Sequence, residues 1–136
     1  MKKVRTVGCF LEHNGAFLIL QRDPAKPYPY TWGLPAGKVD PGETDSQAMI
    51  RELAEEAGYQ ARPEELELLG YQLFRDEQHD VTFPTFRVVL DRPLQVNPRP
   101  GEHLDSRWVT GEECRALPNP IPGLLELLEQ FGYIEK

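Results

Sequence analysis

The segment from Thr44 to Gly58 constrains the fold of this chain more than any other segment. Thr44 or Asp45 can cap the start of a helix, and a glycine at position 58 is typical of its end. These signals predict one helix that runs to Ala57. Its apolar side chains recur at helical spacing and predict a buried face, at Met49, Ile50, Leu53 and Ala57.

The same helix carries an acidic face beside the apolar one. Glu52, Glu55 and Glu56 fall within an arc of about 100°, because each residue turns a helix by about 100°. Like charges at this spacing cost a few tenths of a kcal/mol per pair, so something must offset them. A hard divalent cation would do so, because Mg²⁺ prefers carboxylate oxygens and retained water. On the helix alone, a solvated acidic face partly neutralised by Arg51 is the alternative.

The patterns on either side of this helix predict a mixed sheet covered by helices. Asn14-Gly15 is a strong hairpin signal between two β-prone runs at 6–12 and 16–22. The stretches 23–41 and 92–101 are rich in proline and predict loops, of which the longer is of the kind that is usually functional. Further strands are predicted at 67–75, 81–90 and 105–110, and a leucine-rich amphipathic helix at 122–131.

The charge balance of the chain limits its partners. Its 136 residues contain 15 Lys and Arg against 22 Asp and Glu, a net charge of −7. A non-specific nucleic-acid binder needs basic stripes that replace the counterions on phosphates, so this balance argues against nucleic acid as a partner. A phosphorylated small molecule stays compatible with the charge if a metal ion supplies the positive charge.

Length, cysteine content and apolar runs predict a soluble cytoplasmic protein. At roughly 100–200 residues per domain, the chain has room for one domain over residues 1–136. Cys9 and Cys114 make no disulfide framework and predict free thiols in a reducing compartment. The first apolar run stops at Glu12, which argues against a signal peptide, and no later run is long enough to span a bilayer.

The residues before the helix extend it into a longer motif over residues 37–59. In the order Gly37-x5-Glu43-x7-Arg51-Glu52-Leu53-Ala54-Glu55-Glu56-Ala57-Gly58-Tyr59, it resembles the Nudix box, a loop–helix–loop signature of diphosphate hydrolases. Tyr59 stands where the family prefers an aliphatic residue, and Ala36 where a glycine is more common. The resemblance implies an α/β fold, the Nudix α/β/α sandwich, with a mixed sheet between helices.

The resemblance also implies a metal site. Three carboxylates of the helix and the backbone carbonyl of Gly37 are expected to hold Mg²⁺, with Mn²⁺ as an alternative. A later acidic residue, Glu102, six residues before Trp108, is expected to join Glu52, Glu55 and Glu56 both as a ligand and in catalysis. Asp105, Glu112 and Glu113 are its nearby rivals. Glu56 is expected to be a direct ligand. The general base is left open among Glu52, Glu55 and Glu102. Glu43 is expected to form a supporting ion pair with Arg51.

Substrate-binding residues are implied less specifically. Arg22 lies fifteen residues before Gly37, at the position of an arginine that contacts substrate phosphate in MutT-type enzymes, but it is also a strand-end arginine. Asn119 resembles an asparagine that reads the nucleobase, yet a turn between prolines explains it as well. Tyr28, Tyr30 and Trp32 could stack on a base from the loop, or pack the proline-rich loop onto the domain, and Trp32 in particular is expected in the core. His13, His79 and His103 show no ligand spacing and are expected on the surface.

On this resemblance we expect a metal-dependent enzyme that hydrolyses pyrophosphate bonds in nucleotides. The favoured reaction converts a nucleoside triphosphate to the monophosphate and pyrophosphate. Two alternatives stay open: hydrolysis of a nucleoside diphosphate sugar of the ADP-ribose type, and a sensor that binds a nucleotide without turnover. The expected partner is a small-molecule nucleotide, without nucleic acid or membrane, and a homodimer stays open because the family fold often dimerises.

Overall fold

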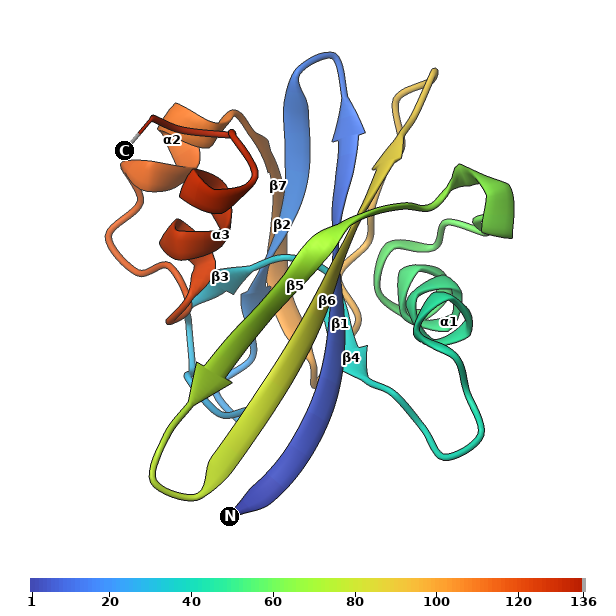
Figure 1. Cartoon of the computed structure of the whole chain (residues 1–136). Helices are drawn as coiled ribbons and strands as arrows, with labels where there is room; N and C mark the ends of the chain where they lie inside the picture. The colour runs from blue at the N-terminus through green and yellow to red at the C-terminus, as the bar shows by residue number, and fades with distance from the viewer. Residues whose placement is uncertain (136) are drawn as a thin grey trace.

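The computed structural model describes residues 1–135, which form a sheet of seven strands with helices on its two faces (Figure 1). The strands are β1 Lys2–His13, β2 Ala16–Arg22, β3 Trp32–Gly33, β4 Ala36–Lys38, β5 Glu67–Arg75, β6 His79–Val89 and β7 His103–Val109. The helices are α1 Asp45–Ala57, a 3-10 turn η1 Pro63–Glu65, α2 Gly111–Arg115 and α3 Leu124–Gln130.

The sheet is mixed, as predicted. Its main path runs β3-β2-β1-β6-β5, with β4 paired to β1 and β7 paired to β2. The pair β1–β6 is parallel, whereas the other paired strands are antiparallel. Along its other edge β1 pairs first with β4 and then, near the hairpin turn, with β2. This division of one strand edge brings β4 into the sheet directly before α1.

The caps of α1 explain its length. The Thr44 side chain accepts a hydrogen bond from the Gln47 N–H, and the Gln47 side chain accepts one from the Thr44 N–H, which satisfies two of the free donors at the helix start. At the other end Gly58 takes a left-handed conformation at φ +70° and donates to the Ala54 carbonyl. The predicted bounds of α1 and both of its end signals are therefore confirmed.

Apolar side chains fill both faces of the sheet. In Figure 1, α1 covers one face, while α2 and α3 cover the other. The first core layer joins strand residues such as Leu18 and Leu20 to Met49 and Leu53 of α1. The second joins Phe10, Phe17 and Ile19 to the buried leucines of α3, with Trp32 beside them. The α/β sandwich expected from the sequence is thus confirmed, and Cys9 and Cys114 are free and buried within it.

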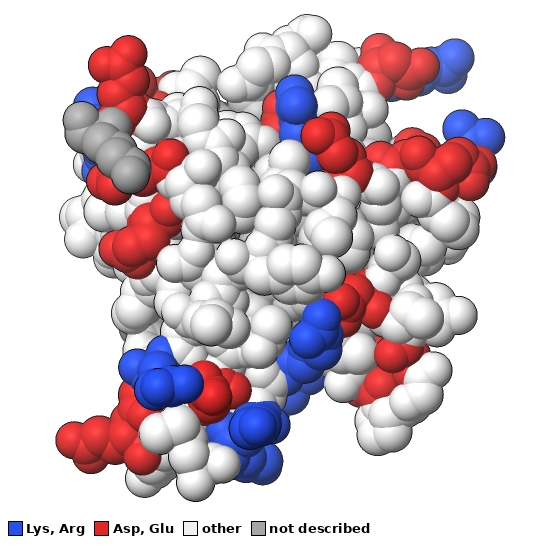
Figure 2. Space-filling model, viewed as in Figure 1, with Lys and Arg blue, Asp and Glu red and all other residues white. Residues whose placement is uncertain are grey.

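Charged side chains surround the exposed face of β5 and β6. Figure 2 shows acidic and basic residues interspersed around the rim of this view, with few charges over the middle of the sheet. β5 lies at the edge of the sheet, and its exposed side chains include Tyr71 and Leu73. Within residues 1–135, no helix combines the length and apolar character needed to cross a membrane.

The structure differs from the predicted elements in its shortest pieces. The stretch 23–41, predicted as a loop, contains β3 and β4, which are too short to show alternation and exist because β2 and β1 offer them a free edge. The strands predicted at 6–12, 81–90 and 105–110 also begin earlier, at Lys2, His79 and His103. Two short helical turns, η1 and α2, carry no periodic signal and were not predicted.

Candidate active site

The acidic face of α1 points toward β4 and the beginning of β7. Glu52 and Glu56 are each only 8% exposed, whereas the side chain of Glu55 is 41% exposed. Carboxylates this deeply buried are uncommon unless a cation or strong hydrogen bonds compensate them. The structure therefore separates the three glutamates of the helix into two buried groups and one that reaches solvent.

Gly37 in β4 leaves the space that the Glu52 carboxylate occupies. A β-carbon built on Gly37 would lie 2.1 Å from Cδ of Glu52, far inside van der Waals contact. The neighbouring Ala36 N–H donates to Oε1 of Glu56 at 2.9 Å. The backbone of β4 thus lies directly against both buried carboxylates, which requires glycine at position 37 but accepts alanine at position 36.

Burial dominates the electrostatics of the two carboxylates. It raises the pKa of Glu56 to about 8, and the charges of Glu52 and Glu102 add to this shift, while the Ala36 N–H and Arg22 oppose it. Burial also raises the pKa of Glu52, against the opposing hydrogen bond from Arg51. The negative charge of Glu102 raises the pKa of both Glu52 and Glu56, so the three carboxylates form a site of concentrated negative potential.

Arg51 connects the loop before the helix to the helix itself. Its Nε and NH2 groups donate to the two oxygens of Glu43, each at 2.9 Å, in a bidentate pair. The same side chain donates to the carbonyl of Lys38 at 3.0 Å and to Oε1 of Glu52 at 2.8 Å. The hydrogen bond from Arg51 holds the pKa of Glu43 down to about 2. The two residues expected to form an ion pair do so in the structure.

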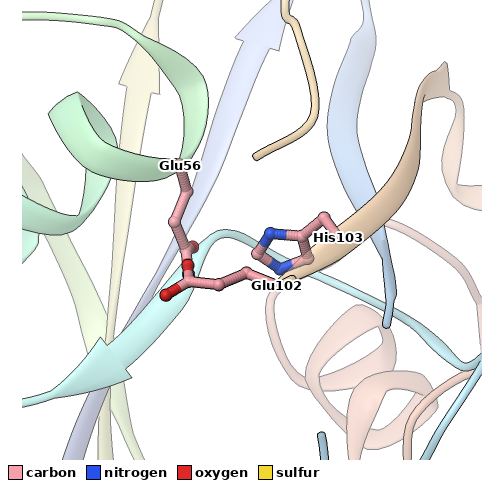
Figure 3. A group of neighbouring side chains, drawn as sticks. All are labelled: Glu56, Glu102 and His103. Carbon is pink, nitrogen blue, oxygen red and sulfur yellow. The ribbon is translucent and has the colours of Figure 1, made fainter. Parts of the chain in front are cut away.

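Glu102 and His103 lie across from α1 where β7 begins. Oxygen atoms of Glu56 and Glu102 and a ring nitrogen of His103 all lie within 4.8 Å of one another. Figure 3 shows the two carboxylates converging and the imidazole directed toward them from the β7 side. The β2–β7 pairing fixes this position, because Arg22 is the register partner of His103 and the Asp23 N–H donates to the Glu102 carbonyl at 2.9 Å.

The rivals of Glu102 have other contacts. Asp105 is exposed and accepts from the Ser106 N–H, Glu112 pairs with Arg115, and Glu113 accepts from the Thr110 N–H in the cap of α2. Of these four acidic residues, Glu102 is the one whose charge acts on both Glu52 and Glu56.

His103 is where sequence reasoning was wrong. It was expected on the surface, but its Nδ1 atom is buried and has no hydrogen-bond partner among residues 1–135. Burial lowers the pKa of its imidazole. Spacing could not reveal this position, because Glu56 lies far away in the sequence; adjacency to Glu102 is the one signal that could have indicated it.

Arg22 and Asn119 lie on the neighbouring loop system and both support its backbone. Nε of Arg22 donates to the Pro27 carbonyl at 2.6 Å. The Asn119 amide donates to the carbonyl of Tyr30. Tyr30 is exposed and has a positive φ of +64°, an uncommon conformation for a bulky side chain. Both predicted substrate residues therefore have structural contacts of their own.

The expected aromatic side chains divide between surface and core. Tyr28, like its neighbour Tyr30, is about half exposed. Trp32 is 4% exposed and packs in the core, with the Arg107 guanidinium 4.9 Å from its ring centroid. The prediction that Trp32 is core is confirmed. Tyr59, the atypical residue of the motif, packs against the first core layer and donates its hydroxyl hydrogen bond to Glu65, so its role is in packing.

The donor set fits a hard divalent cation. Glu56 of α1 and Glu102 from the β7 side converge, and the buried Glu52 lies against Gly37 of β4, close enough for its charge to act on Glu56. Oxygen-rich sets of this kind suit Mg²⁺ and Mn²⁺. Burial raises the pKa of Glu52 and of Glu56, and carboxylates withdrawn from water in this way gain most from a bound cation.

Comparison with known proteins agrees with the fold and the motif. The sequence model of the NUDIX domain family matches residues 2–131, which is nearly the whole chain. The chain therefore belongs to the Nudix family. This confirms, at the level of the family, the expectation of a hydrolase that acts on phosphoric anhydrides in nucleotides.

Individual relatives agree with this assignment. The chain is 32% identical to the CTP pyrophosphohydrolase of Escherichia coli K12 over 138 aligned residues, which cover 96% of this chain and 93% of that protein. It superposes on the crystal structure of a MutT protein from Methanosarcina mazei with a TM-score of 0.81 at 23% identity, covering 96% and 94% of the two chains. The NUDIX domain of Shewanella oneidensis NrtR, crystallised with ADP-ribose, shares the fold with a TM-score of 0.77 at 22% identity, covering 96% and 86%.

Proposed function

We propose that this chain hydrolyses a nucleoside triphosphate to the monophosphate and pyrophosphate with a divalent cation, Mg²⁺ or Mn²⁺. The observation that carries the proposal is the convergence of buried carboxylates on the glycine backbone of β4. Glu52 occupies the place of a side chain at Gly37, Glu56 accepts a hydrogen bond from the neighbouring Ala36 N–H, and Glu102 approaches Glu56. A structural core gains nothing from such a cluster, whereas a cation site requires it.

The residues have distinct parts in this reaction. Glu52, Glu55, Glu56 and Glu102, with the Gly37 carbonyl, would hold the cation, which when bound neutralises pyrophosphate oxygens and lowers the pKa of water. Glu56 is the direct ligand, because its deep burial leaves no solvent to compensate its charge. The general base is one of Glu52, Glu55 and Glu102. Glu43 and Arg51 keep the loop, β4 and the helix in one arrangement.

Contacts of Asn119 support a preference among bases. One N–H of its amide is engaged by the Tyr30 carbonyl, which leaves the second N–H and the side-chain oxygen for a base. The oxygen accepts and the remaining N–H donates, which suits a base with an exocyclic amino group beside a ring acceptor, such as cytosine or adenine. The similarity to a CTP pyrophosphohydrolase supports the same direction. Arg22 is proposed to contact a substrate phosphate from the end of β2.

A phosphate-release screen with Mg²⁺ tests the proposal. Nucleoside triphosphates and nucleotide sugars are assayed with and without added inorganic pyrophosphatase, using wild type, Glu56→Gln and the exposed control Glu129→Gln. We expect phosphate release from a triphosphate only when pyrophosphatase is added. This release should disappear in Glu56→Gln and persist in Glu129→Gln. Direct orthophosphate release from a triphosphate would overturn the proposal.

Two other outcomes would favour the alternatives. Turnover of a nucleotide sugar far above that of every triphosphate would identify a diphosphate-sugar hydrolase. Tight nucleotide binding without turnover in wild type would identify a sensor, although the complete set of glutamates argues against this reading, because a binding module has no need to keep every metal carboxylate.

A further inference from the structure

We propose that His103 donates a ring nitrogen to a divalent cation that it shares with Glu56 and Glu102, and that this ligand makes the site bind Mn²⁺ in preference to Mg²⁺. The inference deepens the proposed function and rests on it, because the cation is the one that the reaction requires. It adds an imidazole to a ligand set otherwise made of oxygen atoms.

The geometry of the three side chains supports a shared cation. Their ligand atoms lie within 4.8 Å of one another (Figure 3). Two ligand atoms bound to one cation at about 2.0–2.2 Å lie no farther apart than about 4.4 Å, so small side-chain rotations bring all three into contact with it. The backbone does not have to move. Residue 103 is already held by the His103 N–H to Arg99 carbonyl hydrogen bond at 3.0 Å and by its pairing with Arg22.

The imidazole has an unsatisfied polar atom. Nδ1 of His103 is buried without a hydrogen-bond partner among the residues that the structure describes. Leaving such an atom unpaired is unfavourable, and native proteins keep few of them. Two carboxylates, of Glu56 and Glu102, lie close to the ring, and the charges of Arg22, Lys26 and Asp23 also act on it. A cation held between the imidazole and the two carboxylates would satisfy the ring and compensate both acids.

The type of ligand determines which cation is favoured. Mg²⁺ prefers oxygen ligands in near-octahedral geometry, whereas imidazole suits Zn²⁺, Cu²⁺, Fe²⁺ and Ni²⁺. Mn²⁺ shares the oxygen preference of Mg²⁺, but as a member of the same transition-metal series it accepts a nitrogen ligand more readily than Mg²⁺ does. A site with one nitrogen among several oxygens therefore gains affinity for Mn²⁺ without losing the ability to bind Mg²⁺. Removing the nitrogen should weaken Mn²⁺ binding more than Mg²⁺ binding.

Electron paramagnetic resonance of Mn²⁺ bound to the full chain tests this directly. Three-pulse electron spin echo modulation reports ¹⁴N nuclei that are bonded to the metal. The variants are His103→Gln and the control His79→Gln, which removes a partly exposed imidazole at the start of β6. We expect a ¹⁴N signal in wild type and in His79→Gln, and none in His103→Gln. A titration that follows free Mn²⁺ by its continuous-wave spectrum gives the affinity of the site. We expect the affinity for Mn²⁺ to fall about tenfold or more in His103→Gln, and the affinity for Mg²⁺, measured by competition, to fall less.

The outcomes separate this inference from the proposed function. A ¹⁴N signal that persists in His103→Gln, or bound Mn²⁺ without a ¹⁴N signal in wild type, overturns the ligand role of His103, while triphosphate hydrolysis tested with Mg²⁺ can still stand. A ¹⁴N signal that depends on His103, together with no turnover of any nucleotide, supports the ligand and overturns the proposed reaction. If His103→Gln fails to fold, wild type labelled with [¹⁵N]histidine gives the answer. When an imidazole is bonded to the metal, the ¹⁴N lines of the spectrum are replaced by ¹⁵N lines. An unchanged spectrum overturns the inference.

Discussion

The carboxylate of Glu52 occupies the place of a side chain at Gly37. A β-carbon added to Gly37 would lie 2.1 Å from Cδ of Glu52. The glycine is therefore required by the side chain of another element and not by its own backbone conformation. This relationship joins β4 to α1 at the proposed cation site, and it yields the most direct prediction about that site.

Gly37→Ala should displace Glu52 and impair both folding and catalysis. We expect a loss of about 1–3 kcal/mol in the free energy of unfolding, because a methyl group is forced into occupied space, and a large fall in kcat. Chemical denaturation and the hydrolysis assay measure the two effects. The double variant Gly37→Ala/Glu52→Ala removes the clash and should recover stability but not activity. Equal instability of the single and double variants would contradict the steric explanation.

Stability should fall with rising pH in the absence of the cation, and the cation should remove this fall. Because the pKa of Glu56 is raised from its usual value near 4.5 to about 8, the metal-free fold binds a proton that the unfolded chain releases. The stabilisation is complete below pH 4.5 and is lost as the pH rises through about 8. Melting temperatures in EDTA should therefore fall from pH 5 to pH 8.5.

Two comparisons check the origin of this effect. Glu56→Gln carries no titrating group and should flatten the pH profile in EDTA. Excess Mg²⁺ should remove the fall in wild type, because the bound cation favours the ionised carboxylate, and its binding at pH 7 should release a proton. A profile in EDTA that is identical in wild type and Glu56→Gln would contradict this assignment.

Arg51→Lys should loosen the connection between the loop and the helix although it keeps the charge. Lysine cannot make the bidentate pair with Glu43 and reach the Lys38 carbonyl at the same time. We expect a lower melting temperature, by about 2–8 °C, and a reduced kcat. Arg62→Lys, at a side chain that is 73% exposed, is the matched control and should change neither. A wild-type melting temperature in Arg51→Lys would mean that charge alone is sufficient.

Glu102→Gln should impair hydrolysis far more than substitution of its rivals. Glu102 shares its surroundings with Glu56, whereas Glu112 pairs with Arg115 on α2. We expect kcat to fall by about a hundredfold or more in Glu102→Gln, and to stay within about twofold in Glu112→Gln. Both are neutral isosteric changes, so the comparison separates position from charge. A comparable loss in both variants would remove Glu102 from the site.

Asn119→Asp should destabilise the loop that carries Tyr30. The amide that donates to the Tyr30 carbonyl becomes a carboxylate that faces the same oxygen. We expect a loss of about 1–2 kcal/mol in the free energy of unfolding together with a raised KM, measured by denaturation and by steady-state kinetics. Asn97→Asp, at an exposed position of the loop before β7, adds the same charge without that contact. An unchanged stability for Asn119→Asp would show that the hydrogen bond contributes little.

Local signals were sufficient for the regular elements. The cap at Thr44, the stop at Gly58, the Asn14-Gly15 turn and the leucine pattern of α3 are all encoded by neighbouring residues, and the structure confirms each of them. The motif over residues 37–59 likewise identified the family. Its spacing places the three glutamates on one face of the helix, and this spacing can be read from neighbouring residues.

The rest of the site depends on contacts between distant segments. β3 and β4 are strands because β2 and β1 offer them edges to pair with, and residues 102 and 103 approach α1 because β7 pairs with β2. The sequence determined by itself the helix, its acidic and apolar faces and the family. The resemblance to the Nudix box also predicted Glu102 at the site, but only the tertiary structure decided that His103 joins Glu56 and Glu102, because hydrogen bonds between strands far apart in the chain set that register and no local pattern encodes it.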